Sequence, residues 1–504
     1  MLNNSNTQLR LKQLGIDTYK EAVIFMRKDC HVCRSEGFGV HARVRVTLKE
    51  KSIIATLNTI DNGLLEHGEV SLSQYAWQLL DATLGDTVEL SHPRPLQSLS
   101  FVRSKLYGNN LDSSEMKHII DDIVKGYYSD INIATFLSAC AGGRLNNVEI
   151  IELTRAMIEV GEKLSWSHNM IVDKHCVGGL PGNRTTLIVV PIVTAFGLVM
   201  PKTSSRAITS PSGTADAMET LAPVDLNIRA MRTVVEKEGG CIVWGGSVSL
   251  SPADDILIRV ERAMDVDSEG QLIASVISKK IAAGSTHIVI DIPVGPTAKI
   301  RSLAAAQNLE LLFKMVMYEF NIHAEIIITD GTQPVGRGIG PALEAKDVLA
   351  VLQNQADAPN DLKEHALLIA AKIIEFSKAV KTGEGKKIAS EILLSGMAWK
   401  KFQSICIAQG GLKEPPTASF THEITAKHKG RVSHIDNRQL SRLAKLAGAP
   451  HDPAAGVKLF TPLDKLVDKD EPLFSIHAES KGELQYAISL LSEVDEIVQV
   501  EVLE

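Results

Sequence analysis

A glycine-rich stretch at residues 173–186, DKHCVGGLPGNRTT, holds the densest group of side chains that could do chemistry. A glycine-rich loop that opens a helix turns backbone N–H groups toward an anion, and Lys174 and Arg184 add positive charge. The Walker A pattern is not met, because Arg184 stands where the lysine should be, so an ATPase is disfavoured. A surface turn that binds nothing is the alternative, and this loop alone does not decide between them.

A second polar cluster follows at residues 202–216, KTSSRAITSPSGTAD. Its Ser and Thr hydroxyls, together with Lys202 and Arg206, could surround a phosphate or a sugar. The alternative is a solvated loop with helix caps, because Ser and Thr are common at such caps. Two clusters of this kind so close together in the sequence favour an anion-binding site.

Two other motifs are weaker evidence for a functional site. Cys30-x-x-Cys33 is a single cysteine pair, whereas structural zinc needs four ligands, and the spacing to His41 and His67 is not diagnostic, so we expect an incidental pair. Residues 331–340 read G-x-G-x-G rather than G-x-G-x-x-G, which predicts a tight strand-to-helix connection instead of a dinucleotide site. The other cysteines are expected to be buried small hydrophobes or part of the glycine-rich stretch.

The elements that must position these loops fall into three segments. Residues 1–95 predict a β-rich module, because residues 40–48 alternate apolar and polar side chains, residues 87–90 form another strand, and Ser73 opens a short helix through Leu80. The segment 96–410 alternates helical and strand patterns, with helices at its beginning and its end. The segment 420–504 predicts a C-terminal α+β domain.

Local signals support the second and third segments. Asp112-x-x-Glu115 resembles a capping box, and Asp361-x-x-Glu364 is expected to start another helix. The β-branched runs at 287–293 and 324–329 predict buried strands of an α/β sheet. Further strands are expected at 431–435 and 472–477, and helices at 440–446 and 482–491. These signals predict a mixed helix-and-strand segment between a small β-rich N-terminal module and a mixed C-terminal segment.

Composition limits the classes of function. The 504 residues include 53 Lys and Arg against 60 Asp and Glu, a net charge of −7, which disfavours a protein that coats nucleic acid or an anionic membrane. The most apolar run, residues 187–200, is interrupted by Pro191 and Gly197, whereas a membrane span needs about 20 apolar residues. Six cysteines are too few for a disulfide scaffold, and no secretory signal is visible, so we expect a cytoplasmic protein.

The two polar clusters also carry a resemblance. DKHCVGGLPGNRTT followed by PKTSSRAITSPSGTADAMETLAPVD resembles the thymidine/pyrimidine-nucleoside phosphorylase family. The similarity continues through EGQLIASVISKK, HIVIDIPVGPTAK, TDGTQPVGRGIGPALEA and GRVSHIDNRQLSRLAKLAGAP, and it covers about residues 100–500. The SSRAITS segment and the extra N-terminal module are most similar to the AMP phosphorylase branch, although bacterial chains of this architecture are commonly assigned as thymidine phosphorylases.

The resemblance implies phosphorolysis, in which inorganic phosphate attacks C1′ of a ribose or deoxyribose and the base departs. Phosphate is then a co-substrate, and no cofactor and no metal are expected. The family also implies the fold: an α/β core with a helical domain, which is the catalytic core at residues 96–410, plus a small N-terminal β-rich module (1–95) and a C-terminal α+β domain (420–504). It further implies a homodimer or a higher homo-oligomer, small-molecule partners without nucleic acid or membrane, and an active site between the helical and α/β parts. An oxocarbenium-like transition state would require that the phosphate be aimed and the departing base be stabilised.

Site residues follow from the resemblance, position by position. In the nucleoside branch Lys174, Thr186 and Thr214 match phosphate contacts, His175 lies near the pyrimidine O2, and Cys176 replaces a phosphate-binding serine. The base-recognising set of that branch corresponds to Arg259, Ser275 and Lys279. Asp267 matches the proton donor of the AMP phosphorylase branch. The nucleotide-binding positions of that branch correspond to Gly179, Ser205, Arg206, Ala207, Ile208, Thr209, Ser210, Thr214, Ser275 and Lys299.

Several alternatives stay open at this point. A purine base gains from protonation by Asp267, and a 5′-phosphate gains from Lys299 or Arg184, which favours a nucleoside 5′-monophosphate (AMP, CMP or UMP) over thymidine. Asp267 could instead be a solvated loop carboxylate, and His175 a structural hydrogen-bonding residue. A Mg²⁺-dependent phosphoribosyltransferase and a non-catalytic nucleotide-binding relative are the competing functions. The sequence leaves open purine or pyrimidine, and ribose or deoxyribose.

Overall fold

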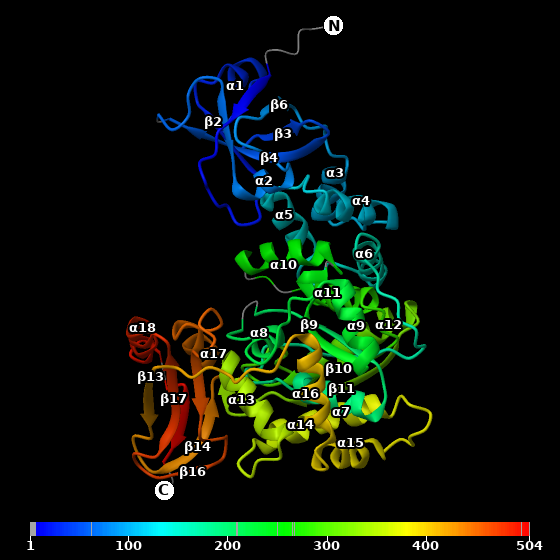
Figure 1. The fold of residues 1–504 in the computed structure, drawn as a ribbon, viewed down its shortest axis with the longest axis vertical. Helices are drawn as coiled ribbons and strands as arrows, with labels where there is room; N and C mark the ends of the chain where they lie inside the picture. The colour runs from blue at the N-terminus through cyan, green and yellow to red at the C-terminus, as the bar shows by residue number, and fades with distance from the viewer. Residues whose placement is uncertain are drawn as a thin grey trace. The chain divides into compact units, whose positions relative to one another are not determined.

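The computed structural model describes residues 7–61, 63–207, 210–248, 250–264, 266, 268–494 and 496–502, with the elements labelled in Figure 1. The chain divides into two compact units. One consists of the residues up to Ala156 together with Ile256–Ser268, and the other of Met157–Asp255 together with the residues from Glu269 onwards. Each unit is described by itself below.

The N-terminal part of the first unit is a closed barrel with strand order β1-β5-β2-β4-β3-β6. Closure leaves no strand edge unpaired, so this small module has no template for edge-to-edge association. The strand expected over residues 40–48 begins only at Arg43, because His41 has a positive φ of 64°. The strands are β1 (Gln8–Leu11), β2 (Val23–Arg27), β3 (Arg43–Leu48), β4 (Lys51–Ile60), β5 (Glu69–Leu72) and β6 (Thr87–Ser91).

Helices complete the first unit. Ser73 caps α2 (Gln74–Leu79), and Asp112 and Glu115 form the predicted capping box of α4 (Ser113–Val124). The remaining helices are α1 (His31–Glu36), α3 (Ser98–Leu106), α5 (Asp130–Cys140), α6 (Asn147–Glu159) and α10 (Pro252–Met264), of which α6 and α10 run across the boundary between the units. A buried ion pair between Lys105 and Glu149, 2.7 Å long, joins α3 to α6.

The second unit is built on parallel strands. The strand order β11-β10-β7 is parallel throughout, and β8 pairs in parallel with β9. A parallel bridge between Ile171 and Val199 links the two groups, so the carboxyl ends of these strands lie at one edge. The strands are β7 (Val172–Cys176), β8 (Met200–Ser204), β9 (Gly240–Trp244), β10 (His287–Val294) and β11 (His323–Asp330).

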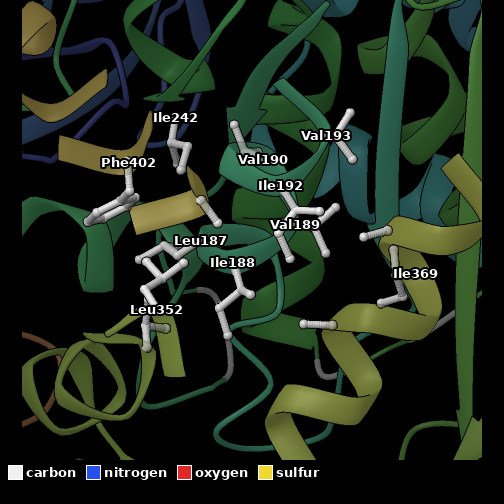
Figure 2. Close-up of a cluster of buried hydrophobic side chains, with 14 of the residues drawn as sticks. Leu187, Ile188, Val189, Val190, Ile192, Val193, Ile242, Leu352, Ile369 and Phe402 are labelled. Carbon is white, nitrogen blue, oxygen red and sulfur yellow. The ribbon is translucent and has the colours of Figure 1, made fainter. Parts of the chain in front are cut away.

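A predominantly apolar helix, α7 (Thr186–Phe196), forms the centre of the core of this unit. Its side chains pack among Ile242, Leu352, Ile369 and Phe402, as Figure 2 shows. The apolar run that the sequence presents after the glycine-rich loop is therefore a buried helix. No helix in the described part of the chain is long and apolar enough to cross a membrane.

The other helices of the second unit surround this core. They are α8 (Thr214–Glu219), α9 (Ile228–Glu238), the 3₁₀ helix Gly245–Val248, α11 (Glu269–Ala282), α12 (Leu303–Glu319), α13 (Pro341–Leu352), α14 (Asn360–Ile374), α15 (Gly385–Leu394) and α16 (Met397–Gln409). The helix expected from Asp361 begins one residue earlier, after Pro359. Asp361 does not cap it, because its carboxylate accepts a hydrogen bond from Gly336 N at 2.8 Å instead.

The C-terminal segment of the second unit forms two helices and two small antiparallel sheets, one of which also includes the strand Gly338–Ile339 from the preceding segment. The sheets have the orders β12-β15-β17-β13 and β16-β14-β18. Their elements are β12 (Gly338–Ile339), β13 (Phe420–Thr425), β14 (Gly430–Ile435), α17 (Asn437–Leu446), β15 (Gly456–Leu459), β16 (Leu466–Val467), β17 (Pro472–Ala478), α18 (Lys481–Leu491) and β18 (Val498–Glu501). The fold class expected from the sequence is confirmed, including both strands and both helices expected after residue 420.

Candidate active site

The polar loops that the sequence singled out follow strands of the parallel sheet. Because the carboxyl ends of parallel strands share one edge, the loops after β7, β8 and β10 meet there. Gly179 shows how closely two of them approach. It has a φ of +80°, and a Cβ at this position would lie 2.8 Å from the backbone nitrogen of Lys299. Only glycine fits, so the loop after β7 rests directly on the loop after β10.

Lys174 is a buried cation on β7. Its Nζ donates a hydrogen bond of 2.6 Å to Thr185 Oγ1, directly before Thr186 at the start of α7. No carboxylate among the described residues forms an ion pair with this ammonium group. Burial lowers the pKa of Lys174, because the charged form loses its hydration. An unpaired buried ammonium at the mouth of a glycine-rich loop is suited to hold an anion.

The adjacent Asp173 is shared by two lysines. Its carboxylate lies 2.8 Å from Lys280 Nζ and 3.4 Å from Lys202 Nζ. Burial acts to raise the pKa of Asp173, but Lys202 and Lys280 lower it below its ordinary value, so the carboxylate stays ionised. Two buried lysines, Lys202 and Lys280, thus flank one aspartate, and buried Lys174 is the next residue on β7, so this part of the strand carries excess positive charge.

Asp291 on β10 faces Cys176 across the parallel ladder. Its Oδ1 accepts a hydrogen bond of 2.6 Å from Thr329 Oγ1, and its Oδ2 lies 3.0 Å from His365 Nε2 on α14. Burial and the neighbouring Asp291 raise the pKa of Cys176 well above its ordinary value, so the residue is a neutral thiol. The Cys176 sulfur accepts a hydrogen bond of 3.2 Å from Asn183 Nδ2, which anchors the glycine-rich loop.

His175 lies at the carboxyl end of β7 and is partly exposed. Desolvation, together with the positive charges of Lys280, Lys202, Lys279 and Lys174, lowers the pKa of His175 well below its ordinary value. The imidazole is therefore neutral at physiological pH. A neutral ring can donate one N–H hydrogen bond to a carbonyl oxygen without carrying charge.

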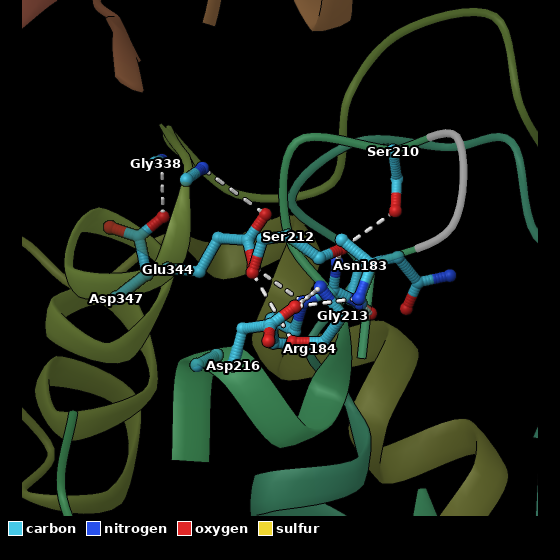
Figure 3. Close-up of polar contacts among 12 residues, drawn as sticks. Asn183, Arg184, Ser210, Ser212, Gly213, Asp216, Gly338, Glu344 and Asp347 are labelled. Atoms are coloured by element: carbon cyan, nitrogen blue, oxygen red, sulfur yellow. Dashed lines mark hydrogen bonds and ion pairs between the residues drawn. The ribbon is translucent and has the colours of Figure 1, made fainter. Parts of the chain in front are cut away.

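The side chain of Arg184 binds other groups of the protein rather than pointing to a free site. Its guanidinium forms a short ion pair with buried Glu344 and donates hydrogen bonds to the carbonyl oxygens of Ser212 and Asn183, at 2.5 and 3.0 Å (Figure 3). The sequence presented this arginine as a candidate for a 5′-phosphate. That role is corrected, because all three nitrogens of the guanidinium group are already engaged.

The hydroxyl-rich loop after β8 is organised by one carboxylate. Asp216 Oδ2 accepts hydrogen bonds from the backbone nitrogens of Ala207 and Gly213, at 2.7 and 2.8 Å, and Figure 3 shows this carboxylate beside Gly213. Thr214 begins α8 from this loop, and Ser205 is exposed. Ser210 Oγ donates to the Ser212 carbonyl oxygen at 2.8 Å.

Arg206 in the same loop is paired with carboxylates rather than free. Its guanidinium forms ion pairs with Glu219 and, at 3.4 Å, with Asp216, and it lies 4.9 Å from the Trp244 ring centroid. The cation therefore stabilises the loop and the start of α8. Ile208 and Thr209, the other predicted binding residues of this loop, lie outside the described residues.

The predicted base-recognising residues are distributed over both units. Ser275 and Lys279 lie one turn apart on α11, where Lys279 Nζ donates to Ser275 Oγ at 3.1 Å and pairs with Asp254 at 2.7 Å. The positive charge of Lys279 also contributes to the lowered pKa of His175. Arg259 belongs to the first unit and forms a bidentate ion pair with Asp130, at 2.6 and 2.7 Å. Asp267, the predicted proton donor, lies outside the described residues.

Sequence reasoning missed three members of this site, Asp173, Asp291 and His365. Asp173 lies within the DKHC motif, and its position next to Lys174 on a buried strand was an available signal. Asp291 and His365 become visible only through strand register and helix packing. Within the described ranges, no group of three or more His, Cys, Asp or Glu side chains is placed to hold a metal ion.

Comparisons with known proteins agree with this architecture. Residues 168–399 match the glycosyl transferase family a/b domain, and residues 99–161 match the helical bundle domain of that family. Residues 431–497 match the pyrimidine nucleoside phosphorylase C-terminal domain. The crystal structure of anthranilate phosphoribosyltransferase from Thermus thermophilus shares the fold, with a TM-score of 0.50 and 19% identity, over 61% of this chain and 98% of that one.

Two relatives match along almost the whole chain, and each is named "Putative thymidine phosphorylase". The protein from Legionella pneumophila (strain Paris) is 60% identical over 490 residues, which is 97% of this chain and 95% of that protein. The protein from Polaromonas sp. (strain JS666 / ATCC BAA-500) is 54% identical over 493 residues, which is 98% of this chain and 96% of that one. The chain therefore belongs to the glycosyl transferase family that contains these two proteins, and it is a pentosyltransferase of the thymidine phosphorylase type.

Proposed function

We propose that the protein cleaves the N-glycosidic bond of a nucleoside 5′-monophosphate or a nucleoside by phosphorolysis. The observation that carries this proposal is Lys174, a buried ammonium without a carboxylate partner among the described residues, beneath a glycine-rich loop. Inorganic phosphate supplies the missing negative charge. Thr186 and Thr214 begin the helices that follow the two polar loops, so their hydroxyls and nearby backbone N–H groups are suited to the same anion.

The chemistry follows from this placement. A phosphate oxygen bonds to C1′ while the bond from C1′ to the base nitrogen breaks and its electron pair leaves with the base. Positive charge around Asp173 offsets the negative charge of the phosphate and holds it ready for attack. His175, held neutral by burial and by its lysine neighbours, donates a hydrogen bond to the base carbonyl oxygen, where negative charge develops.

For the base, we assign recognition to Ser275 and Lys279. Ser275 and Lys279 present a hydroxyl and an ammonium from one face of α11. Asp267 is proposed as the proton donor for a purine leaving group. No cofactor beyond co-substrate phosphate is part of the proposal.

A nucleoside 5′-monophosphate is the substrate that we propose first. Lys299 follows β10 and rests against Gly179 of the glycine-rich loop, so a cation adjoins the phosphate-binding segment. In the loop after β8 we assign a nucleotide contact to the exposed Ser205, because Arg206 and the Ala207 N–H are held by carboxylates and Arg184 is committed to Glu344. Thymidine is the second candidate, favoured by the names of the two relatives.

Release of free base, followed by HPLC from AMP, CMP, UMP and thymidine in parallel, tests both candidates. Phosphate-dependent and magnesium-independent release from the monophosphates, with thymidine inert, supports the first. Release from thymidine alone supports the second and assigns the leaving-group role to His175. Turnover that requires Mg²⁺ and a pyrophosphorylated sugar would indicate a phosphoribosyltransferase, and no release from any substrate would indicate a non-catalytic nucleotide-binding protein.

A further inference from the structure

A carboxylate, Asp291, is buried between the parallel sheet and α14. This helix places Leu362, Ala366 and Ile369 in the apolar core of the second unit, and Asp291 is 0% exposed. A charge in such an interface lowers stability unless other groups compensate it. The neighbours of this carboxylate therefore indicate what it does.

Each oxygen of the Asp291 carboxylate faces a different partner. Thr329 Oγ1, on the neighbouring strand β11, donates a hydrogen bond of 2.6 Å to Oδ1. His365 Nε2, on α14, lies 3.0 Å from Oδ2, and both side chains are almost wholly enclosed. Burial acts to raise the pKa of Asp291, but its polar neighbours, His365 foremost, lower that pKa below its ordinary value. The carboxylate is therefore ionised and held from two sides.

The ammonium group of Lys174 has this carboxylate within its reach. Asp291 is opposite Cys176 in the parallel register of β7 and β10, and Lys174 is two residues earlier on β7. The three side chains therefore share one face of the sheet, and strand spacing places the Cα atoms of Lys174 and Asp291 about 8 Å apart. The flexible four-carbon stem of a lysine is long enough to close that gap.

Lys174 nevertheless points to the glycine-rich loop. Its Nζ donates to Thr185 Oγ1 at 2.6 Å, and Thr185 Oγ1 donates to Asn183 Oδ1 at 3.0 Å. Asn183 Nδ2 in turn donates to the Cys176 sulfur at 3.2 Å. The chain of hydrogen bonds starts at the ammonium group and runs through the loop. The nearby carboxylate of Asp291 takes no part in it.

We propose that Thr329 and His365 are positioning residues that hold the Asp291 carboxylate away from Lys174, and so keep this ammonium group available for phosphate. The inference rests on the proposed function, in which Lys174 binds inorganic phosphate. A carboxylate oxygen released from either partner pairs with Lys174, and phosphate must then displace it. If only a tenth of the molecules keep the ammonium group free, phosphate binds about tenfold more weakly.

Calorimetric titration of the full chain with inorganic phosphate tests the role of His365. His365→Leu keeps an apolar contact for α14 but releases Oδ2 of Asp291, so the Kd for phosphate should rise about tenfold. His365→Gln still presents an N–H group to that oxygen and should bind phosphate as the unmodified chain does. Asp291→Asn, added to His365→Leu, removes the charge that captures Lys174 and should restore binding. Glu364→Gln, which breaks a surface ion pair with Lys386, is the control on the same helix.

Thr329 gives a second test that does not depend on α14. Thr329→Val removes the hydrogen bond to Oδ1 and should weaken phosphate binding in the same direction, whereas Thr329→Ser should retain it. An unchanged Kd in His365→Leu, or in Thr329→Val if the first variant fails to fold, would overturn the proposal. A loss of binding that Asp291→Asn does not reverse would also overturn it, because packing rather than the carboxylate would then be the cause.

The same titrations separate this inference from the proposed function. Phosphate binding that changes as expected in the variants, without release of base from any substrate, would contradict phosphorolysis alone. Phosphorolysis by the unmodified chain, with a phosphate Kd that is the same in every variant, would overturn the positioning role alone. An unmodified chain that binds no phosphate would overturn both.

Discussion

The guanidinium group of Arg184 donates a hydrogen bond to the carbonyl oxygen of Ser212 at 2.5 Å, and this contact joins the loop after β7 to the loop after β8. The same side chain forms an ion pair with Glu344, which is fully buried on α13. One arginine thereby fixes two candidate substrate loops to the core of the second unit. A residue that the sequence offers as a ligand for phosphate is in the structure a positioning residue.

Replacement of Arg184 should therefore act on stability. Arg184→Ala leaves Glu344 buried without its partner, which costs about 3–5 kcal/mol in the free energy of unfolding. Urea denaturation measures this loss. Lys314→Ala removes an exposed ion pair to Glu310 and serves as the control, with an expected change below about 1 kcal/mol. Equal effects of the two substitutions would contradict the assigned role of Arg184.

Replacement of Lys174 should lower activity without lowering stability. Lys174→Met removes a buried ammonium that has no carboxylate partner among the described residues, so the free energy of unfolding should not fall. Phosphorolysis should fall about 100-fold or more in kcat/KM for phosphate, and phosphate should no longer raise Tm. Lys280→Met is the matched control, because it breaks the pair with Asp173 and should lower stability. A Lys174→Met protein that is still stabilised by phosphate would exclude Lys174 from the phosphate site.

His175 should make the protein less stable in acid. Its pKa is lowered in the folded state, so below about pH 6.5 the unfolded chain binds a proton that the folded protein does not. Stability is then lost as pH falls through this region, by at most about 1.4 kcal/mol per pH unit from this one group. His175→Gln should flatten that part of the profile in urea denaturation at pH 7.5, 6.5 and 5.5. The exposed His422→Gln should retain the slope of the unmodified protein, and an unchanged slope in His175→Gln would count against a neutral imidazole.

Local sequence signals predicted the elements of the fold well. The β-branched runs became β10 and β11, the Asp112–Glu115 box caps α4, and Ser73 caps α2, because each signal acts within a few residues. The predicted start of α14 was wrong by one residue, because Asp361 accepts a hydrogen bond from Gly336 N, which lies on a distant loop. A side chain that can cap a helix can equally satisfy a backbone group elsewhere, and the sequence does not show which.

The partners of the charged side chains could not be predicted in the same way. The sequence showed Lys202 and Arg206 as cations free for phosphate, but Asp173 holds Lys202, and Glu219 and Asp216 hold Arg206. Motif spacing places a charge on a loop, whereas its partner depends on which strands and helices pack together. The predicted role of Lys174 remains a prediction, but the absence of an ion-pairing carboxylate among the described residues gives it a physical basis that the sequence lacked.

The last prediction concerns Asn437, which links the C-terminal segment to the loop after β10. Its Nδ2 donates hydrogen bonds to Thr297 Oγ1 at 3.0 Å and to the Gly331 carbonyl oxygen at 3.1 Å, and its backbone nitrogen also donates to Thr297 Oγ1. Thr297 lies two residues before Lys299. We therefore expect Asn437→Leu to raise KM for phosphate or nucleotide about tenfold while kcat changes little, because it shifts the loop and not the reacting groups.

A double-mutant cycle isolates this contact. Asn437→Leu and Thr297→Val both remove the hydrogen bond from Asn437 Nδ2 to Thr297 Oγ1, so the double variant should cost less than the sum of the single variants, by about 0.5–3 kcal/mol in kcat/KM. Arg442→Ala, an exposed change on the same helix, controls for a general effect on α17. Strictly additive effects would show that Asn437 and Thr297 act separately. Coupling in unfolding free energy without coupling in KM would mean that the contact stabilises the fold but does not position Lys299.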